Sequence, residues 1–215
     1  VGDVLTYSMS GAPSTLSIDS ATGAISGTPT NDDVGAHTIT VTATDVALAS
    51  ASDEFVLTVV NTNDAPTVTS PIADASTDED AAYSLDSSSA FTDVDVGDVQ
   101  AYSISGAPSS LSIAWSTGII SGSPTNDDVG THTITVTATD VALASASDTF
   151  VLTVVNTNDA PTVAAAIADA SNDEDAAFTL DASAAFADVD VGDVLTYSMS
   201  GAPSTLSIDS ATGAI

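Results

Sequence analysis

Side chains that can bind a metal ion through oxygen are concentrated in a few short turns of this sequence. NTND at 61–64 returns unchanged at 156–159, and the other turns are TDED at 77–80, TDVDVGD at 92–98 and TNDD at 125–128. Carboxylates and amides without His or Cys suit Ca²⁺, which takes about six to eight oxygens, whereas Mg²⁺ demands a tighter octahedron. These turns predict calcium sites if the fold brings them together.

The charge of the chain bears on the same question. The sequence has 30 Asp and Glu residues and no Lys or Arg, so its formal charge is −30 at pH 7. No basic side chain can pair with these carboxylates, and salt or bound metal has to relieve their repulsion. The same charge repels phosphate backbones and anionic lipids, so we expect no nucleic-acid partner and no direct membrane insertion.

The composition is that of a folded chain. With 43% apolar residues it does not have the low hydrophobicity of disordered proteins. Cysteine is absent, which excludes disulfides and thiol chemistry. No apolar run is long enough to span a bilayer, and no signal peptide is visible.

A long internal repeat organises the chain. Residues 1–25 recur letter for letter at 191–215, and a close variant occupies 96–120, so the period is 95 residues. This period exceeds the common solenoid units and matches a small domain. We therefore expect tandem domains that meet at NTNDAP. The predicted divisions are 1–64 (the back part of a repeat), 65–159 (a complete repeat) and 160–215 (the front part of a third).

Runs rich in Val, Ile, Thr and Tyr, separated by Gly, Pro, Asn, Asp and Ser, predict an all-β fold of seven-stranded, Greek-key immunoglobulin-like sandwiches in tandem. The strands of the complete repeat are expected near 67–73, 81–85, 99–104, 110–114, 118–122, 131–139 and 148–155.

Two of these strands have a clear core-facing side. In 131–139 the alternation places His132, Ile134, Val136 and Ala138 on one side, and in 148–155 it does the same for Phe150, Leu152 and Val154. His37 and His132 occupy the same repeat position. We expect them to be core or rim residues rather than catalytic bases or metal ligands.

Strand direction decides where the acidic turns lie. If the strands run alternately up and down, the 92–98 turn and Asp140 share one pole, while 77–80 and 125–128 share the other, beside the exit linker. Head-to-tail repeats then bring opposite poles together at NTND. The first junction is predicted to gather Asn31, Asp32, Asp33, Asn63, Asp64, Asp93, Asp95 and Asp140. The second is predicted to gather Glu79, Asn126, Asp127, Asp128, Asn158, Asp159, Asp188 and Asp190.

A simpler interpretation exists for each turn alone. Asp and Asn are good turn residues for conformational reasons, and this suffices for TNDD by itself. For the combined set we favour a metal site, because several like charges at one pole repel unless a dication bridges them.

Together these motifs resemble a cadherin-type repeat in its bacterial form, the cadherin-like and immunoglobulin-like repeats of large surface adhesins. TDED resembles the acidic PEN-type turn, TDVDVGD followed by AYSIS resembles the TDxDxG turn and its YSI strand, and SIDSATGAI resembles IDxxTGxI. TATD and NTNDAP fall where the family has AxD and its DxNDNxP linker.

The resemblance implies a ligand set for Ca²⁺. The matching residues are Asn63, Asp64, Glu79, Asp93, Asp95 and Asp140, with their copies 95 residues on, which include Asn158, Asp159, Glu174, Asp188 and Asp190. The linker has Asn61 and Ala65 in place of the family's first Asp and last Asn, and TNDD lacks the family's Glu and Arg. We therefore expect one or two ions per linker rather than three.

The expected function is that of a non-enzymatic, calcium-stiffened stalk in a secreted or cell-surface adhesin, with neighbouring repeats as its partners. No catalytic residue is predicted, since phosphate-binding loops, paired zinc ligands and Cys nucleophiles are absent. The acidic pairs recur at each linker, which favours a structural role over glycoside hydrolysis. Two alternatives stay open: self-association into an extracellular filament or sheath, and a carbohydrate-binding accessory module that uses Trp115.

Overall fold

The structure is a computed structural model that describes residues 4–215; the first three residues of the predicted first repeat lie outside this part. Within 4–215 the regular structure consists of β-strands and short 3-10 helices, which confirms the all-β class. No helix of the described residues is long and apolar enough to cross a membrane. The chain divides into two units. The first holds the residues up to Ser70 with Ser89–Ala101 and Thr137–Ser147, and the second holds Pro71–Ser88, Tyr102–Val136 and Asp148–Ile215.

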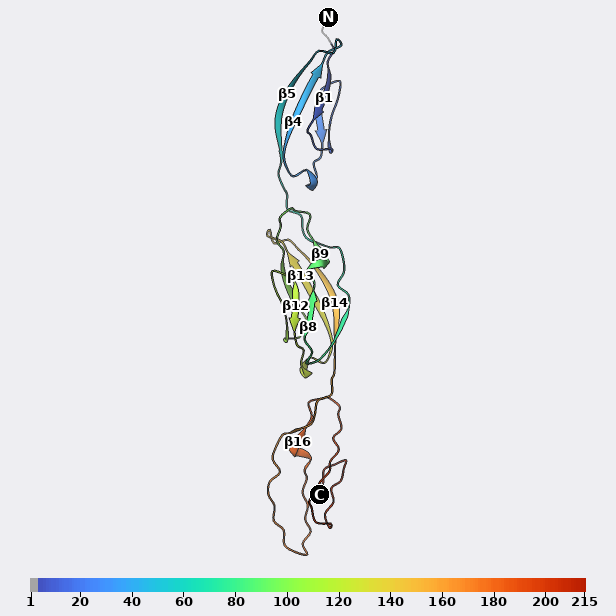
Figure 1. The fold of residues 1–215 in the computed structure, drawn as a ribbon, viewed down its shortest axis with the longest axis vertical. Helices are drawn as coiled ribbons and strands as arrows, with labels where there is room; N and C mark the ends of the chain where they lie inside the picture. The colour runs from blue at the N-terminus through green and yellow to red at the C-terminus, as the bar shows by residue number, and fades with distance from the viewer. Residues whose placement is uncertain (1–3) are drawn as a thin grey trace. The chain divides into compact units, whose positions relative to one another are not determined.

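The first unit contains an antiparallel sheet in the order β1–β4–β5 (Figure 1). Its strands are β1 (Thr6–Ser10), β4 (Gly35–Thr44) and β5 (Ser50–Val59). A separate hairpin pairs β2 (Leu16–Ile18) with β3 (Ile25–Gly27), and the 3-10 helix η1 (Asn31–Asp33) precedes β4. In the same unit β6 (Thr67–Val68) pairs with β9 (Phe91–Thr92).

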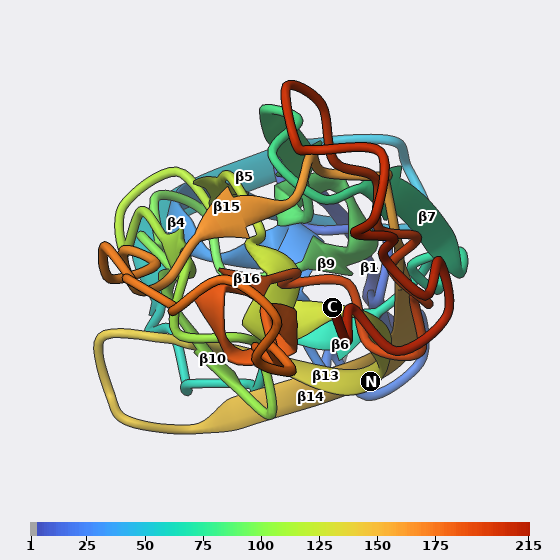
Figure 2. The ribbon, with the colours of Figure 1, turned by 90° about the horizontal axis from the view of Figure 1, so that it is seen from below.

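The complete repeat contributes two further sheets, in the orders β10–β13–β14–β7 and β11–β12–β8. Figure 2 shows the long strands β13 and β14 running beside each other. β7 pairs with β14 in parallel, with Leu152 opposite Ala75, as expected if the first and last strands of a repeat run the same way. The strands are β7 (Ala75–Asp78), β8 (Tyr83–Asp86), β10 (Ala101–Ser105), β11 (Leu111–Ile113), β12 (Ile119–Gly122), β13 (Gly130–Thr139) and β14 (Ser145–Val155), with η2 (Ser88–Ala90) and η3 (Asn126–Asp128) between them.

The first strand of the repeat differs from the prediction. It was expected as one run over 67–73, but the structure has two short strands, β6 and β7, with Pro71 between them. Proline has no N–H to give to a strand ladder, so the run is interrupted there. The next residue, Ile72, donates its N–H to Oδ2 of Asp148 at 2.6 Å, and the chain resumes as β7 on β14. The pairing of β6 with β9 was not predicted.

The predicted core alternation is confirmed. Ile134, Val136 and Ala138 are fully buried, and so are Phe150, Leu152 and Val154. His132 is half-buried, with Nε2 2.6 Å from the carbonyl oxygen of Asp128; His37 has the same contact with Asp33.

Phe150 and Phe55 occupy equivalent repeat positions but differ in burial, which gives a matched pair of variants. Phe150 is 1% exposed and Phe55 is 43% exposed. Truncation of a buried Phe leaves a cavity, so we expect Phe150→Ala to lower the free energy of unfolding of its repeat by about 3–5 kcal/mol. Phe55→Ala should cost less than half as much. Urea unfolding of dilute protein measures both, and equal losses would contradict the assigned core.

The third repeat, in the second unit, shows how far strand formation depends on partners. Residues 194–215 have the sequence of residues 4–25, yet they contain no strand where the first copy forms β1. One backbone hydrogen bond is the same in both copies: Tyr197 N–H donates to the carbonyl of Ser210 at 2.9 Å, as Tyr7 N–H donates to that of Ser20. β1 pairs with β4, and residues 160–215 include no counterpart of β4. This repeat keeps only β15 (Thr162–Val163), η4 (Ser183–Ala185) and β16 (Phe186–Ala187).

Candidate metal centres

The loop between β9 and β10, which we call the acid loop (residues 93–98), folds so that its carboxylates turn inward. The N–H of Asp95 donates to Oδ1 of Asp93 at 2.9 Å, and the N–H of Asp98 donates to the carbonyl of Asp95 at 3.2 Å. Gly97 takes a φ of +93°, a conformation open to glycine at little cost. Val96 points outward and is 97% exposed. The alternation of Asp and Val therefore places acid inside the loop and apolar side chains outside it.

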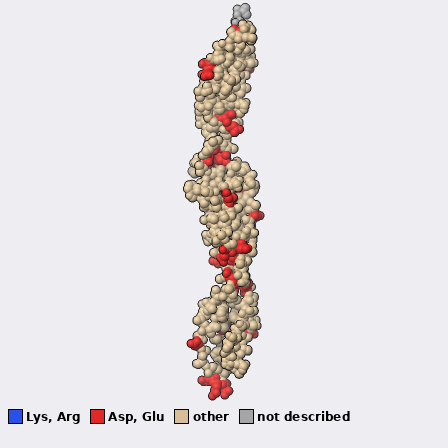
Figure 3. All heavy atoms as spheres, viewed as in Figure 1, with Lys and Arg blue, Asp and Glu red and all other residues tan. Residues whose placement is uncertain are grey.

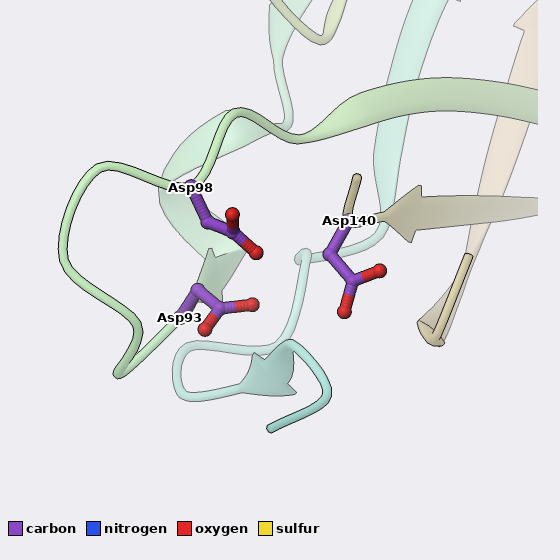
Figure 4. A group of neighbouring side chains, drawn as sticks. All are labelled: Asp93, Asp98 and Asp140. Carbon is purple, nitrogen blue, oxygen red and sulfur yellow. The ribbon is translucent and has the colours of Figure 1, made fainter. Parts of the chain in front are cut away.

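Three carboxylates meet at this loop. Asp93, Asp98 and Asp140 each offer an oxygen, and these oxygens all lie within 4.8 Å of one another. Figure 4 shows Asp93 and Asp98 extending from the loop toward Asp140, which follows the end of β13. All three residues belong to the first unit. Sequence reasoning predicted Asp93 and Asp140 and missed Asp98.

The linker NTND is bonded to the same group. The N–H of Asp64 donates to Oδ2 of Asp95 at 2.8 Å. The amide of Asn63 donates to Oδ2 of Asp140 and to the carbonyl of Asp64, both at 2.8 Å. From the preceding repeat, the amide of Asn31 donates to Oδ2 of Asp64 at 2.8 Å. The structure thus brings together six residues predicted for the first junction and its linker, namely Asn31, Asn63, Asp64, Asp93, Asp95 and Asp140.

Several of these carboxylate oxygens are buried without a partner. Oδ2 of Asp93, Oδ1 of Asp95 and Oδ2 of Asp98 accept no hydrogen bond, and Asp95 is only 6% exposed. Burial of an ionised carboxylate without compensation is costly. The sequence contains no Lys or Arg that could supply the missing charge. Converging, unpartnered carboxylate oxygens are a donor set that fits Ca²⁺.

The acids of this group differ in how firmly they hold a proton. Burial raises the pKa of Asp98, and the negative charges of Asp93, Asp140 and Asp95 add to the increase. The hydrogen bond from Asn63 lowers the pKa of Asp140. The bond from Asn63 thus stabilises the ionised form of Asp140, while burial and the neighbouring charges destabilise the ionised form of Asp98.

This difference predicts that Asp98→Asn shifts the melting temperature in opposite directions without and with calcium. A carboxyl whose pKa is raised by folding destabilises the folded state above that pKa, and the penalty disappears as pH falls below the ordinary value of 3.8. In EDTA at neutral pH, Asp98→Asn should therefore raise the melting temperature, with the gain lost in acid. In excess Ca²⁺ it should lower the melting temperature.

The exposed Asp127→Asn removes the same charge and serves as the control in these thermal melts. If Asp98→Asn shifted the melting temperature in the same direction in EDTA and in Ca²⁺, the assignment of Asp98 as a calcium ligand would be contradicted.

The second unit repeats this geometry. Oxygens of Asp188, Asp190 and Asp193 lie within 4.8 Å of one another, and the N–H of Asp190 donates to Oδ1 of Asp188 at 3.0 Å. The linker N–H of Asp159 donates to Oδ2 of Asp190 at 2.7 Å, and the amide of Asn126 donates to Oδ2 of Asp159 at 2.7 Å. Oδ1 of Asp190 is buried without a partner, like its counterpart in the acid loop.

Glu79 approaches the second linker from the preceding repeat. It is 2% exposed, and its Oε1 accepts a hydrogen bond from the N–H of Thr157 at 2.7 Å. Its Oε2 is buried and has no hydrogen-bond partner. Asn158 donates its amide to the carbonyl of Asp159 at 2.7 Å, which shapes the linker itself.

Other predicted ligands have different surroundings. Oδ2 of Asp33 accepts from the N–H of Thr30 at 2.8 Å and from the hydroxyl of Thr15 at 2.7 Å, so Asp33 completes the capping box that Thr30 begins at η1. Asp128 does the same at η3, where its side chain accepts the N–H of the cap residue Thr125 at 3.0 Å. The bond from Thr30 lowers the pKa of Asp33, and the bond from Thr125 lowers that of Asp128. Three more predicted ligands lie exposed on the surface, namely Asp32, Asp127 and Glu174.

Asp98 and Asp193 are the additional members of the two acidic groups. Each follows the glycine of a TDVDVGD or ADVDVGD turn, and the positive φ of that glycine brings it back toward the first Asp of the motif. The full motif has three Asp residues in all, placed on both sides of the glycine. This motif is the sequence signal that would have identified Asp98 and Asp193 as members of the acidic groups. Figure 3 shows acidic side chains in separate patches with wide uncharged surface around them.

Mainly antiparallel β-sheets in successive repeats, with acidic loops hydrogen-bonded to the linkers, define a tandem β-sandwich repeat protein of the immunoglobulin-like and cadherin-like class. The chain belongs to the family described as "Putative Ig domain", whose model matches residues 1–60, 65–155 and 160–215. The resemblance identified in the sequence is thereby confirmed.

Relatives and solved structures agree with this class. The serine-rich adhesin for platelets of Staphylococcus aureus strain MRSA252 is 40% identical over 147 residues, which cover 68% of this chain and 10% of that protein. The strain USA300 adhesin is 39% identical over 147 residues, again 68% of this chain but 6% of that protein. The chain therefore spans a tenth or less of the length of these relatives.

Two cadherin structures share the fold. Human CDH23 EC21–23 matches with a TM-score of 0.62 at 19% identity, covering 99% of this chain and 82% of that one. Mouse cadherin-23 EC22–24 matches with a TM-score of 0.53 at 21% identity, covering 73% and 55% respectively.

Proposed function

We propose that this chain is a non-enzymatic spacer in an adhesin, and that Ca²⁺ bound at the acid loops stiffens the junctions between its repeats. The observation that carries the proposal is the set of buried, unpartnered carboxylate oxygens beside the linker, in a chain without basic residues. The similarity to a staphylococcal adhesin supports the adhesin role and a location outside the cell, at its surface.

The repeats themselves are the units of this proposal. We place their limits in the two NTND linkers, so that 65–159 is a complete repeat between parts of two others. The family matches, which break at 60–65 and 155–160, support these limits. The partners of each repeat are then its neighbours in the same chain.

The ligand set follows from the geometry of the first unit. Asp93, Asp95, Asp98 and Asp140 supply the carboxylate oxygens, and the linker residues Asn63 and Asp64 lie against them. In the second unit Asp188, Asp190 and Asp193 take the same places beside Asn158 and Asp159. Asp32, Asp33, Asp127 and Asp128 are not needed. Glu79 offers one more buried oxygen at the second linker.

Stiffening follows because the ion and the linker use the same side chain. Oδ2 of Asp95 accepts the N–H of Asp64, while its Oδ1 is unpartnered and available to a cation. Without a cation, the like charges of Asp93, Asp95 and Asp98 repel each other and the loop is destabilised. The hydrogen bond to the linker is weakened with it. Calcium therefore stabilises the attachment of the linker as well as the loop.

Small-angle scattering of the 215-residue chain in excess Ca²⁺ and after chelation tests this proposal. We expect the distance distribution to change on chelation. The double variant Asp93→Asn/Asp98→Asn leaves the site around Asp190 intact, so in Ca²⁺ it should give a profile between those of the original chain with and without Ca²⁺. The double variant Asp32→Asn/Asp127→Asn removes the same charge at exposed positions and should respond to Ca²⁺ like the original chain. An unchanged profile after chelation would overturn the proposal.

A further inference from the structure

One hairpin turn of the complete repeat differs from its two copies at exposed positions. The turn between β11 and β12 reads AWSTGI at 114–119, where 19–24 and 209–214 both read DSATGA. Trp115, the one tryptophan of the sequence, is 69% exposed, and Ile119 is 38% exposed. The turn therefore carries exposed apolar side chains that the other two copies do not have.

The same differences remove a carboxylate that stabilises the turn. In the first copy, Oδ1 of Asp19 accepts the N–H groups of Ala21 and Thr22 at 2.8 and 2.9 Å. Asp209 makes the equivalent two bonds in the third copy, both at 2.9 Å. The complete repeat has Ala114 at this position, which offers no side-chain acceptor. Loss of this cap lowers stability and an exposed aromatic ring adds none, so the differences point to a contact with a ligand.

The backbone of the turn is the same with and without the carboxylate. The N–H of Gly118 donates to the carbonyl of Ala114 at 2.9 Å, and the N–H of Ala114 donates to that of Ile119 at 2.8 Å. In the first copy, Gly23 makes the first of these bonds to Asp19 at 2.8 Å. Gly118 and Gly23 have φ values of +68° and +73°. The tryptophan therefore extends from a hydrogen-bonded hairpin turn of defined geometry.

The sheet β11–β12–β8 presents polar groups on its exposed side, next to this turn. Ser121 pairs with Ser112 of β11 and with Ser84 of β8, so the three side chains lie on one side of the sheet. Two residues along β12 on the same side, Ile119 pairs with Asp86. All five residues are exposed. We call this set, together with Trp115, the outer face; its residues all lie in the second unit.

We propose that the outer face binds a neutral saccharide chain, with a pyranose ring against Trp115 and its hydroxyl groups bonded by Asp86 and the three serines. The C–H side of a pyranose ring is apolar and packs on an aromatic ring, while its hydroxyl groups need donors and acceptors. Serine hydroxyls serve as both, and a carboxylate is a strong acceptor. Because these side chains lie on an exposed sheet face, the site suits a polysaccharide chain that lies across it.

Charge decides which saccharides fit the outer face. The chain has a formal charge of −30 and no Lys or Arg, so it repels sulfated chains and chains of uronic acids. Asp86 accepts the N–H of Ser88 at 3.0 Å and its hydroxyl at 2.7 Å, both through Oδ1. The bond from the Ser88 hydroxyl lowers the pKa of Asp86, which is therefore an ionised acceptor at neutral pH. The site adds a ligand contact to one repeat of the proposed spacer and does not depend on calcium.

Tryptophan fluorescence of the 215-residue chain in EDTA, titrated with cellohexaose, chitohexaose and maltohexaose, tests this inference. Because Trp115 is the one tryptophan, a saturable change of its emission reports on this site. We expect such a change with at least one of these neutral saccharides and none with the uronic polysaccharide alginate. No change with any of the three would overturn the inference. A change with choline alone would also overturn it, in favour of a cation bound against the ring.

The double variant Ala114→Asp/Trp115→Ser gives the turn the first two residues of its copies. It should raise the melting temperature through the restored cap and weaken saccharide binding in isothermal titration calorimetry by more than about tenfold. A loss of binding in a more stabilised chain cannot come from misfolding. Asp86→Asn should weaken binding by about threefold to tenfold, and Asp127→Asn, at an exposed residue outside the outer face, should leave it unchanged. Undiminished binding by the double variant would overturn the inference.

Discussion

Chelation of calcium is expected to lower the melting temperature of this chain by about 10–20 °C. A ligand that binds only the folded state at about 100 times its dissociation constant stabilises it by about 2.7 kcal/mol. For a domain of the size of one repeat, 1 kcal/mol of stability corresponds to about 4–8 °C in melting temperature. Bound calcium relieves the repulsion among Asp93, Asp95, Asp98 and Asp140, whose buried oxygens have no basic partner. Chelation restores this repulsion and therefore lowers the melting temperature. Differential scanning calorimetry across a Ca²⁺ series measures the shift.

Magnesium is the control for general screening. At equal concentration Mg²⁺ has the same charge but prefers a compact octahedron with several waters, so it should restore only a small part of the loss. Equal recovery with Mg²⁺, or no response to chelation, would show that the acidic groups are stable without a specific ion.

Asp95→Asn is expected to weaken calcium binding by more than about tenfold, which is 1.4 kcal/mol. Asp95 is the residue shared by the linker and the acidic group. Asn keeps an oxygen that can accept the N–H of Asp64, so the substitution removes the charge and spares the hydrogen bond. Isothermal titration calorimetry should show the loss at one site while the site around Asp190 still binds.

Two further substitutions serve as comparisons for Asp95→Asn. Asp190→Asn should reproduce the effect in the second unit, where Asp190 accepts the N–H of Asp159. Asp128→Asn should leave calcium affinity unchanged and instead lower stability, because Asp128 completes the capping box at η3. Calcium binding by Asp95→Asn with undiminished affinity would remove Asp95 from the ligand set.

Local patterns account for the parts of the fold that the sequence predicted. The alternation over 131–139 and the series Phe150, Leu152 and Val154 report which side of a strand faces the core, because side chains alternate along any strand. Strand direction then placed Asp140 and the acid loop beside the linker, and the hydrogen bonds of Asn63 and Asp64 agree with that placement.

Features that depend on distant partners were not predictable in this way. The pairing of β6 with β9 joins two-residue strands that carry too short a pattern to detect. The 22 letters shared by residues 4–25 and 194–215 form β1 only where β4 is available, so no local pattern could decide between the two outcomes.

The candidate site shows the same division. Asp98 was missed because its approach to Asp93 depends on the backbone turn at Gly97. Asp33 and Asp128 were predicted as metal ligands, and in the structure their side chains bond to Thr30 and Thr125, which stand three residues before them in the spacing of a capping box.

A crystal structure grown in calcium tests the central claim most directly. We expect a peak of density among Asp93, Asp95, Asp98 and Asp140, about 2.3–2.6 Å from the carboxylate oxygens, together with the bond from Asp64 to Asp95. A well-ordered acid loop whose carboxylates contact only water or one another would contradict the claim that a divalent ion holds the junction.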